Sequence, residues 1–315
     1  MHSETSTLRV YIWQTKKWGK MLSKSNQVEA IFNIDNIQIE KRSLGMKQFG
    51  FFILGISLSE ISDINTLNKI KILAEKEKVL FTQIETINYT GKEENIYKEL
   101  FKENIGYYKK FITRYTAVID LEKTEEVILA DMKPKGRYNI KLALKKEIEV
   151  KEVENNKENI KKYYDLMIET TSRDNFSGNS LDYYITFLKE LENSKLLLAY
   201  KDGKVISGGI FVFDKELSIY YYGASTSQKE YRNMMAPYLV QWEAIKIAKK
   251  MNSKIFDFLG VATPNSINDP LEGVTSFKRK LTPDIREVSE GYIFINRIFI
   301  YRIFKIIKKI KSIIK

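Results

Sequence analysis

Apolar residues recur along the chain with two different periods, and the alternation of these periods predicts mixed strands and helices. Apolar residues at every second position, or in a short continuous run, predict strands, and a spacing of three to four predicts amphipathic helices. In the first half, the expected elements are a strand at 8–13, a helix at 16–26, two strands within 30–58, a helix at 60–78, a strand at 79–87, a helix at 92–106 and a strand at 113–121. This half therefore predicts an α/β domain.

The second half shows a clearer order of elements. The expected elements are helices at 160–171 and 180–192, three antiparallel strands within 194–225, a helix at 236–252 and a strand at 254–261. Turns at Asp202-Gly203 and Asp214-Lys215 separate the three strands, and Asp-Gly between apolar runs is a good hairpin signal. This order resembles the acyltransferase fold of the GNAT type, and the first half has a looser version of it, which suggests a duplication. The expected fold class is α/β (α+β).

Composition narrows the chemistry that the chain could perform. It has 315 residues, about right for two ordinary domains, and 52 Lys and Arg against 40 Asp and Glu, so the formal net charge is +12. It contains no cysteine, and its one histidine is His2. These counts exclude disulfide scaffolds, thiolate catalysis, Cys/His zinc sites and Ser-His-Asp catalysis. Any chemistry must use carboxylates, lysines, tyrosines, backbone dipoles or the substrate itself.

The sequence shows neither a signal peptide nor a membrane span. The first residues lack a long apolar run after a basic start. The longest apolar stretch with almost no charge, residues 49–58, is far shorter than the ~20 residues that a spanning helix needs. We therefore expect a cytoplasmic protein. A pI near 9.3 suggests a polyanionic partner, such as nucleic acid, a phosphorylated substrate or an anionic membrane surface, although a lysine-rich proteome gives the same charge.

A basic segment beginning at Asp131-Met-Lys-Pro-Lys-Gly-Arg is the first candidate for function. Its cations could neutralise several phosphates, and they are Lys133, Lys135, Arg137, Lys141, Lys145 and Lys146. The alternative, a solvated helix that links two domains, is favoured when charge is considered alone.

A second candidate follows the strand end Tyr220-Tyr-Tyr-Gly-Ala-Ser225. In acyl-CoA-binding members of the GNAT fold, a glycine-containing turn at this place directs backbone N–H groups at a pyrophosphate. The corresponding stretch here has Met235 in place of the glycine, and a side chain would crowd a phosphate that needs close backbone approach. We therefore expect no coenzyme A site of the usual kind.

The third candidate is Phe277-Lys278-Arg279-Lys280, which follows an expected loop from Gly260 to Gly273. A lysine after a buried aromatic residue, close to the sheet, could place one cation in a cleft. Taken by itself, the motif favours the alternative, an ordinary surface lysine.

Four stretches, in this order and spacing, resemble the FemABX family of peptidoglycan aminoacyltransferases: DMKPKGRYNIKLALKKEIEV, the YYYGAS strand end, MAPYLVQWEAI and GVTSFKRKL. The resemblance covers residues 130–281 and extends more weakly over the N-terminal half, where Gln14 and Trp18 look like the family's opening segment. It implies two tandem GNAT-like domains without a coiled-coil arm. The first is expected at 1–145, completed by a C-terminal helix at 290–315, and the second at 146–289.

The resemblance also implies a function. Members of this family move an amino acid from an aminoacyl-tRNA to the stem peptide of a peptidoglycan precursor, either UDP-MurNAc-pentapeptide or lipid II. We expect a monomer with no metal or other cofactor. Lys278 falls on the family's catalytic lysine, with Phe277 beside it, and Tyr222 and Tyr183 fall on tyrosines that contact the substrate.

At other positions the chain departs from the family's pattern. Ser177 stands where a threonine occurs, and Asn179 stands where an arginine binds phosphate, a contact that Arg173 could replace. The resemblance also makes Lys135, Arg137 and Lys141 candidate contacts to tRNA or phosphate. Leu22 occupies the place of a family lysine, for which Lys20 or Lys24 could substitute.

The implied mechanism suits a chain without catalytic histidine or cysteine. An aminoacyl ester is already activated, so a neutral amine can attack it while the protein aligns the reactants and stabilises the oxyanion. Lys278 is the expected cation, and the amine proton is expected to leave through the tRNA ribose or a water. Asp257 is an alternative general base, although its place at the end of a buried strand favours a structural role.

The C-terminal segment from Gly291 to Lys315 contains seven basic residues, no acidic residue and apolar residues at helical spacing. A basic amphipathic helix of this kind is typical of interfacial membrane contact. In the resembled family, however, the last helix packs on the first domain. We therefore expect 292–304 to pack and 305–315 to be weakly attracted to an anionic membrane surface.

Two rival functions remain open at this point. One is a GNAT-like N-acyltransferase that uses acyl-CoA or another acyl donor on a small amine, against which Met235 argues. The other is a catalytically silent module that binds tRNA or membrane, which would need neither Lys278 nor Tyr222.

Overall fold

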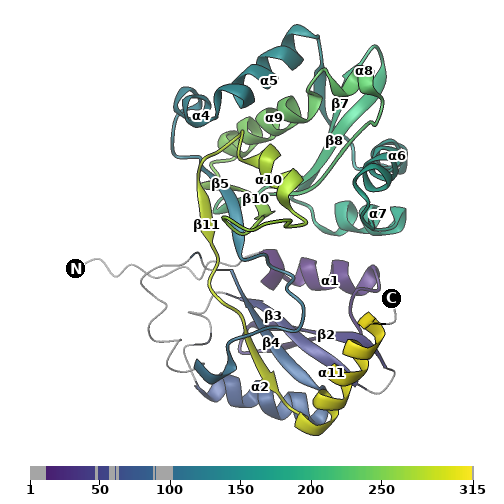
Figure 1. Cartoon of the computed structure of the whole chain (residues 1–315), viewed down its shortest axis with the longest axis vertical. Coiled ribbons are helices and arrows are strands. Elements are labelled where there is room, and N and C mark those ends of the chain that lie inside the picture. The colour runs from purple at the N-terminus through teal and green to yellow at the C-terminus, as the bar shows by residue number, and fades with distance from the viewer. Residues whose placement is uncertain are drawn as a thin grey trace, which may run out of the picture. The chain divides into compact units, whose positions relative to one another are not determined.

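The computed structural model divides the chain into two compact units (Figure 1). The structure describes residues 12–46, 49–56, 61, 64–87, 89 and 102–313. Unit 1 contains the chain up to Ile112 and again from Glu287, and unit 2 contains Thr113–Arg286. The fold is α/β with one sheet in each unit, as expected. Among the described helices the longest has 18 residues, shorter than the three to four heptads of a coiled-coil arm.

The boundary between the units lies earlier than residue 145, where the sequence placed it. Residues 115–120 form a strand of the unit 2 sheet, in which Thr116 pairs with Gly260. The helix at 134–145 packs against the helix at 236–250 of the same unit. Because these strand and helix partners lie more than 90 residues further along the chain, no local pattern places the boundary.

Unit 1 is built on a five-stranded sheet in the order β1-β2-β3-β4-β12. Its elements are η1 (Ile12–Gln14), α1 (Lys16–Lys24), β1 (Ala30–Ile34), β2 (Ile37–Met46), β3 (Phe49–Ile56), α2 (Ile64–Lys76), β4 (Phe81–Thr86), η3 (Lys102–Asn104), β12 (Tyr292–Ile295) and α11 (Ile298–Ile313). β1, β2 and β3 pair antiparallel, β3 and β4 pair parallel, and β12 pairs antiparallel with β4. A tight turn joins β1 to β2 through Asp35 and Asn36, both with positive φ, which is the I′ hairpin geometry.

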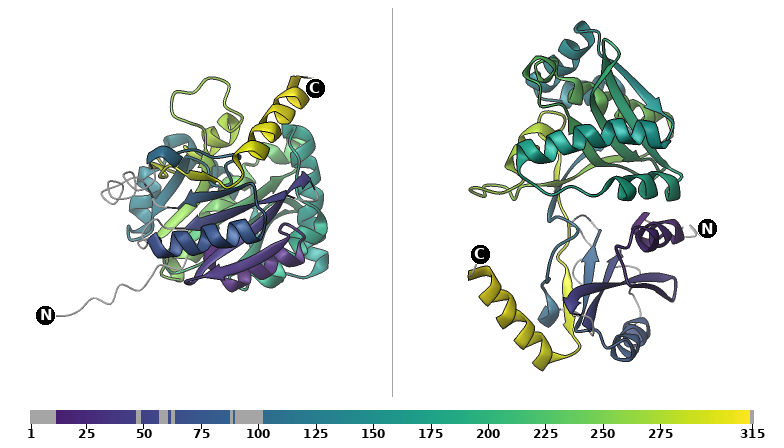
Figure 2. Two further views of the ribbon diagram at one scale, coloured as in Figure 1. Left: turned by 90° about the horizontal axis from the view of Figure 1, so that it is seen from below. Right: turned by 90° about the vertical axis from the view of Figure 1, so that its right-hand side faces the viewer.

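The alternation of β3 decides which helix covers which face of this sheet. Phe52, Leu54 and Ile56 pack with α2 in one apolar cluster. Phe51 and Ile53 point to the opposite face and pack with α11 in another. The right-hand view of Figure 2 shows the strands of this sheet between α11 and α2.

Two expectations for unit 1 fall partly outside the described residues. Of the strand expected at 8–13, residues 8–11 lie outside the described residues. The last two residues, Ile12 and Trp13, belong to the single turn η1. Most of the helix expected at 92–106 also lies outside them, and residues 102–104 form the turn η3.

The opening segment with Gln14 and Trp18 has a structural role. The Gln14 amide bridges two strands, because its Nε2 donates to the carbonyls of Gln38 at 3.2 Å and Gly55 at 3.0 Å, and its Oε1 accepts from Gln38 N at 2.7 Å. Trp18 Nε1 donates to the Glu40 carboxylate at 3.1 Å. Leu22 is buried in the core, whereas Lys20 and Lys24 are exposed. The position of the resembled family's lysine therefore faces inward in this chain.

Unit 2 is built on a seven-stranded sheet in the order β11-β5-β10-β9-β8-β7-β6. Its strands are β5 (Tyr115–Asp120), β6 (Glu149–Val153), β7 (Ser194–Lys201), β8 (Lys204–Val212), β9 (Leu217–Ser225), β10 (Ile255–Val261) and β11 (Ile285–Glu287). Its helices are α4 (Glu125–Asp131), α5 (Pro134–Lys145), α6 (Lys157–Asp174), α7 (Leu181–Glu190), α8 (Lys229–Arg232), α9 (Ala236–Lys250) and α10 (Glu272–Lys278). Figure 1 shows α5 and α9 on one side of the sheet and α6 and α7 on the other.

The expected three-strand meander is present as β7, β8 and β9, paired antiparallel. Asp202 and Gly203 both have positive φ, as their hairpin turn requires. The short helix α10 replaces the last part of the expected loop 260–273, and α4 was not expected. Asp269, Pro270 and Glu272 are start signals of a helix, and they could have revealed α10 in the sequence.

Candidate functional site

The parallel strands β9 and β10 part in the middle of the unit 2 sheet. They pair only where Leu217–Ile219 lies beside Ile255–Asp257. Beyond this point β9 continues to Ser225 beside β8, whereas Gly260 and Val261 of β10 pair with β5. We call the place where the two strands part the fork.

A buried carboxylate shapes the β10 side of the fork. Asp257 Oδ1 accepts from the backbone N–H of Leu259 at 2.6 Å and from the Thr116 hydroxyl. Leu259 has a φ of 58°, in the left-handed region that β-carbon-bearing residues adopt only at a cost of about 1–3 kcal/mol. Because the Asp257 carboxylate is engaged in holding this bulge, the structure favours the structural role over the general-base alternative.

The bulge directs two carbonyl groups at Lys278, the last residue of α10. Lys278 Nζ donates to Gly260 O at 2.7 Å and to Leu259 O at 3.2 Å. Its side chain is only 5% exposed, so the surface-lysine alternative is wrong. Burial lowers the pKa of Lys278 to about 8, and the nearby Asp257 carboxylate opposes this effect. Lys278 is thus a buried cation at the fork, with two of its three N–H groups bonded to carbonyls of the described residues.

Phe277 orients α10 from its other side. Its ring packs edge-to-face on Tyr238 of α9, with ring centroids 4.9 Å apart. The Tyr238 hydroxyl in turn accepts a hydrogen bond from the Asn139 side chain of α5. Phe277 therefore acts as packing that fixes the helix that carries Lys278.

The two tyrosines expected to bind substrate meet each other. Tyr183 of α7 and Tyr222 of β9 place their hydroxyl oxygens 2.9 Å apart, although 39 residues separate them in the chain. Tyr184 and Phe187 pack edge-to-face around the Tyr222 ring, at 5.3 and 5.7 Å. Burial raises the pKa of Tyr222 well above its usual value, so its hydroxyl is neutral. A neutral hydroxyl pair of this kind can donate to a phosphate oxygen.

The loop before α7 carries the other expected contacts. Asn179 hydrogen-bonds to the hydroxyl of Tyr184, which opposes the effect of burial that raises the pKa of Tyr184 to about 12. Ser177 is exposed in the same loop. Ser180 caps α7 by accepting from Tyr183 N at 3.2 Å. The loop therefore fixes the start of the helix that carries Tyr183.

Arg173 is engaged in holding the end of β9. Its Nη1 donates to the carbonyls of Ser225 at 3.1 Å and Thr226 at 3.3 Å. Its Nε and Nη2 form a two-point ion pair with Asp174 at 2.8 and 2.9 Å. Since these contacts occupy most of the guanidinium, Arg173 positions the end of the strand that bears Tyr222.

The three candidates on α5 differ from one another. Arg137 Nη1 donates to Ala130 O at 3.0 Å and to Met132 O, so it caps the C-terminal end of α4. Lys135 is exposed and lies over the Tyr138 ring, 4.7 Å from its centroid, and Lys141 is also exposed. The structure therefore leaves Lys135 and Lys141 as surface cations and gives Arg137 a structural role.

The start of α5 lies against Lys280, two residues after Lys278. Lys133 N donates to Lys280 O at 3.2 Å. A β-carbon at Gly136 would lie 2.0 Å from the same carbonyl oxygen. This close approach requires glycine and joins the basic helix α5 to the end of α10.

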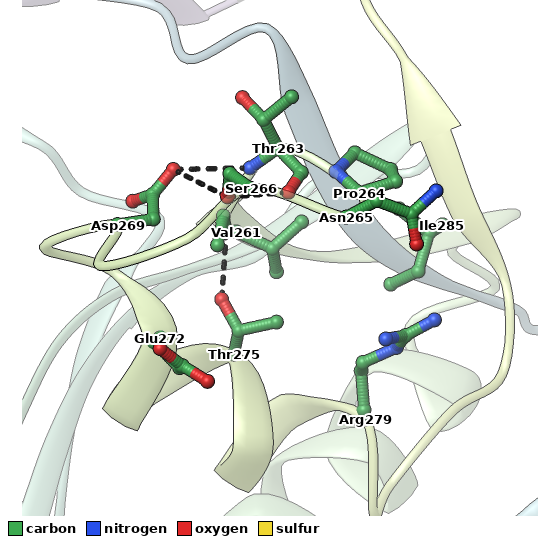
Figure 3. Close-up of a pocket in the computed structure, with 11 residues that line it drawn as sticks. Val261, Thr263, Pro264, Asn265, Ser266, Asp269, Glu272, Thr275, Arg279 and Ile285 are labelled. Carbon is green, nitrogen blue, oxygen red and sulfur yellow. Dashed lines mark hydrogen bonds between the residues drawn. The ribbon is translucent and has the colours of Figure 1, made fainter.

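A pocket of about 200 Å³ lies beside α10 and was not expected from the sequence (Figure 3). It is lined by Val261, Ala262, Thr263, Pro264, Asn265, Ser266, Asp269, Glu272, Thr275, Arg279 and Ile285. Asp269 holds the loop by accepting from Leu271 N at 2.9 Å and Thr263 N at 3.2 Å. Figure 3 shows the Arg279 side chain extending beside Ile285 along one wall. Two of its lining residues, Val261 and Arg279, directly follow Gly260 and Lys278 in the sequence. Arg279 gives the pocket a cation of its own.

The start of α9 is a poor cradle for a pyrophosphate. Met235 adopts the left-handed conformation, with φ 60°, that its glycine counterpart would adopt freely, and its side chain packs against the core. Pro237 removes one of the first N–H groups of the helix. Among the described residues, no group of three Asp, Glu or His side chains lies close enough together to hold a metal ion.

Comparisons with known proteins identify the family of the chain and its fold. The model of the FemAB family matches residues 98–203 and 189–309. The lipid II:glycine glycyltransferase of Staphylococcus haemolyticus is 24% identical, over 57% of this chain and 58% of that protein. The aminoacyltransferase FemA of Staphylococcus epidermidis is 25% identical, over 78% of this chain and 54% of that protein. The chain therefore spans little more than half the length of these curated relatives.

Solved structures share the fold. A crystal structure of FemX superimposes with a TM-score of 0.80 at 16% identity, covering 93% of this chain and 94% of that one. The C-terminal domain of a putative lysylphosphatidylglycerol synthetase from Agrobacterium fabrum matches with a TM-score of 0.59 at 9% identity, covering 86% and 85%. Because the family model matches more than half of the chain, from residue 98 to residue 309, the chain belongs to the FemAB family.

Proposed function

We propose that the chain is an aminoacyltransferase that moves an amino acid from an aminoacyl-tRNA to an amine on the stem peptide of a peptidoglycan precursor. The observation that carries the proposal is the buried Lys278 cation at the fork, held by two carbonyls in a chain of the FemAB family. The names of its relatives, an aminoacyltransferase and a lipid II:glycine glycyltransferase, support the same reaction class.

The proposed reaction needs no protein nucleophile. The acceptor amine attacks the carbonyl carbon of the aminoacyl ester, a C–N bond forms, and the C–O bond to the tRNA ribose breaks. The amine proton passes to the departing ribose oxygen, directly or through a water. Lys278 would donate its third N–H to the oxyanion, a contribution of about 3 kcal/mol for one well-placed donor. Alignment of the two reactants contributes several kcal/mol more.

The acceptor is proposed to bind at the tyrosine pair. Tyr183 and Tyr222 place neutral hydroxyl groups together, and either form of the precursor, nucleotide-linked or lipid-linked, carries a diphosphate whose oxygens accept hydrogen bonds. Asn179 would support this site through Tyr184, and Arg173 through the end of β9.

The donor is proposed to approach from the side of α10 and α5. Arg279 lines the pocket beside α10, and α5 begins against Lys280. Lys135 and Lys141 lie exposed along that helix, where cations can contact the phosphates of an RNA backbone. The Tyr138 ring beside Lys135 adds an exposed aromatic face on which a base can stack.

The proposal is tested by incubating the purified full chain with charged total tRNA and each of the two acceptors, and reading the product by mass spectrometry. We expect one or more amino acids on the acceptor, and no transfer after ribonuclease treatment. Transfer that survives ribonuclease when acyl-CoA is present would instead support the N-acyltransferase alternative, against which Met235 and Pro237 argue.

A pair of variants tests whether the loss of turnover is specific to Lys278. Lys278→Met should lower turnover about a hundredfold. Lys189→Met, which removes an exposed lysine from the last turn of α7, is the matched control and should leave turnover unchanged. Equal activity of the two variants would remove Lys278 from the reaction.

A further inference from the structure

The C-terminal helix α11 leaves an apolar line uncovered. Phe299, Ile303, Ile306 and Ile310 follow one another at helical spacing, and their side chains are 77%, 42%, 59% and 51% exposed. Ile298 and Ile307 border this line and are exposed as well. Apolar residues exposed singly are ordinary, but a continuous line of them marks a surface that contacts something.

The opposite side of α11 accounts for its packing in unit 1. Ile300, Tyr301 and Phe304 belong to the apolar cluster on one face of the sheet. The Tyr301 ring lies 5.5 Å from Phe81, and the Phe304 ring lies 5.5 Å from Tyr108. Figure 2 shows α11 leaving the end of β12 as a single outer helix of this unit. The helix is thus docked by one side only, and the apolar line is on the other.

Cations accompany the apolar line. Arg302 and Lys305 are exposed, and at 100° per residue they lie along one border of it. From Gly291 to the end of the sequence there are seven basic residues and no acidic one. The surface therefore combines an apolar line with positive charge that no acidic residue of the segment offsets.

We propose that the outer side of α11 docks in the interface of a bilayer that contains anionic phospholipid. The apolar line would enter the boundary between headgroups and acyl chains, while Arg302 and Lys305 stay among the anionic headgroups. The helix would lie in the plane of the membrane, because none of the described helices is long and apolar enough to cross it. A second copy of the chain fits the surface poorly, since two such acid-free helices repel each other.

The expectation from sequence was that residues 292–304 pack and that residues 305–315 are weakly attracted to an anionic membrane surface. In the structure Phe299 and Ile303 are exposed rather than packed. The proposed membrane contact therefore begins nearer the N-terminal end of α11 and includes insertion of apolar side chains. The docking stands independently of the proposed function, although a lipid-linked acceptor would be presented at the same surface.

Co-sedimentation with vesicles tests the proposal. The full chain is mixed with vesicles of phosphatidylcholine alone or of phosphatidylcholine with phosphatidylglycerol, at low and at physiological salt. We expect binding to the anionic vesicles at both salt concentrations, weaker at the higher one, and at least about tenfold weaker binding to phosphatidylcholine.

Two sets of substitutions separate the two parts of the surface. Phe299→Ser with Ile303→Ser and Ile306→Ser should lower binding at least about tenfold at both salt concentrations. Arg302→Gln with Lys305→Gln should lower it mainly at low salt. Ile72→Ser is the matched control, because Ile72 is 68% exposed on α2 of the same unit, and it should leave binding unchanged. Melting temperatures of all variants should stay within a few degrees of the wild type, since the replaced side chains are exposed.

Three results would overturn the proposal: wild-type binding by the serine variant, equal binding to both kinds of vesicle, or a wild-type dimer that the serine substitutions convert to a monomer. In the last case the apolar line covers a second copy. Transfer to the nucleotide-linked acceptor is measured in parallel and should be the same for all of these variants. A chain that binds vesicles but transfers no amino acid would refute the proposed function and leave the docking surface intact.

Discussion

The protonation of Lys278 provides the sharpest test of its proposed role. Burial lowers the pKa of Lys278 to about 8, so about nine-tenths of the molecules carry the charge at pH 7 and about one-tenth at pH 9. A lysine that stabilises an oxyanion acts only in its protonated form. The contribution of Lys278 to the rate should therefore fall about tenfold between these two pH values.

Replacement by arginine isolates this effect from every other titration. The acceptor amine reacts faster as it loses its proton, so the rate should rise with pH, and in the wild type this rise should flatten above about pH 8 as Lys278 loses its proton. Lys278→Arg keeps its charge throughout this range, and its rate should continue to rise as the amine loses its proton, without flattening near pH 8. The protonation of the amine affects both enzymes equally, so it cancels in the ratio of the wild-type rate to the Lys278→Arg rate. This ratio should drop about tenfold from pH 7 to pH 9.

The assay is transfer to the nucleotide-linked acceptor under kcat/KM conditions, corrected for spontaneous hydrolysis of the aminoacyl ester at each pH. Lys278→Met should be about a hundredfold slower than wild type at pH 7 and should approach it at high pH. A flattening near pH 8 that persists in Lys278→Arg would assign that titration to another group. A wild-type rate that increases through pH 8, with no such increase in Lys278→Met, would make Lys278 a base and refute the oxyanion role.

Three other predictions concern acceptor binding, stability and packing. Tyr222→Phe and Tyr183→Phe should each raise the KM for the acceptor more than they lower kcat, because the hydroxyl pair is proposed to bind phosphate; steady-state kinetics with varied acceptor measures both. Since the pKa of Lys278 is lowered from 10.5 to about 8, the folded chain binds fewer protons than the unfolded chain between these values. The free energy of unfolding of the wild type should therefore rise with pH across that window by up to about 3 kcal/mol relative to Lys278→Met, as measured by urea titration. Gly136→Ala should cost about 1–3 kcal/mol, because its β-carbon would lie 2.0 Å from Lys280 O, and thermal denaturation measures the loss.

The chain offers a matched control for two of these substitutions. The Tyr163 hydroxyl is buried and has no hydrogen-bond partner within the described residues, so Tyr163→Phe should not change the KM for the acceptor. A β-carbon at Gly273 of α10 meets nothing within 4 Å, so Gly273→Ala should leave the stability unchanged or raise it by up to about 1 kcal/mol. An acceptor KM that rises as much in Tyr163→Phe as in Tyr222→Phe would mean that the hydroxyl pair only packs.

The sequence alone determined most of the elements, because strands and helices follow from local periodicity. Asp202-Gly203 could only be a tight turn between two apolar runs, and the helix entered through Pro237 lies at 236–250. Sequence also determined the family and the residues that carry its motifs, among them Lys278 and Tyr222. The absence of cysteine and the single His2 excluded whole classes of catalysis without any structure.

Only the tertiary structure decided how these residues are used, because their partners lie far away in the chain. Residues 113–145 joined unit 2 through pairing of β5 with β10, and Lys278 became a buried cation because α10 placed it against the carbonyls of Leu259 and Gly260. Arg137 and Arg173 look like phosphate ligands in the sequence, but each donates to carbonyls that end a neighbouring element. A charge pattern records which cations a chain has, whereas burial and hydrogen bonding between distant segments decide which of them remain available to a ligand.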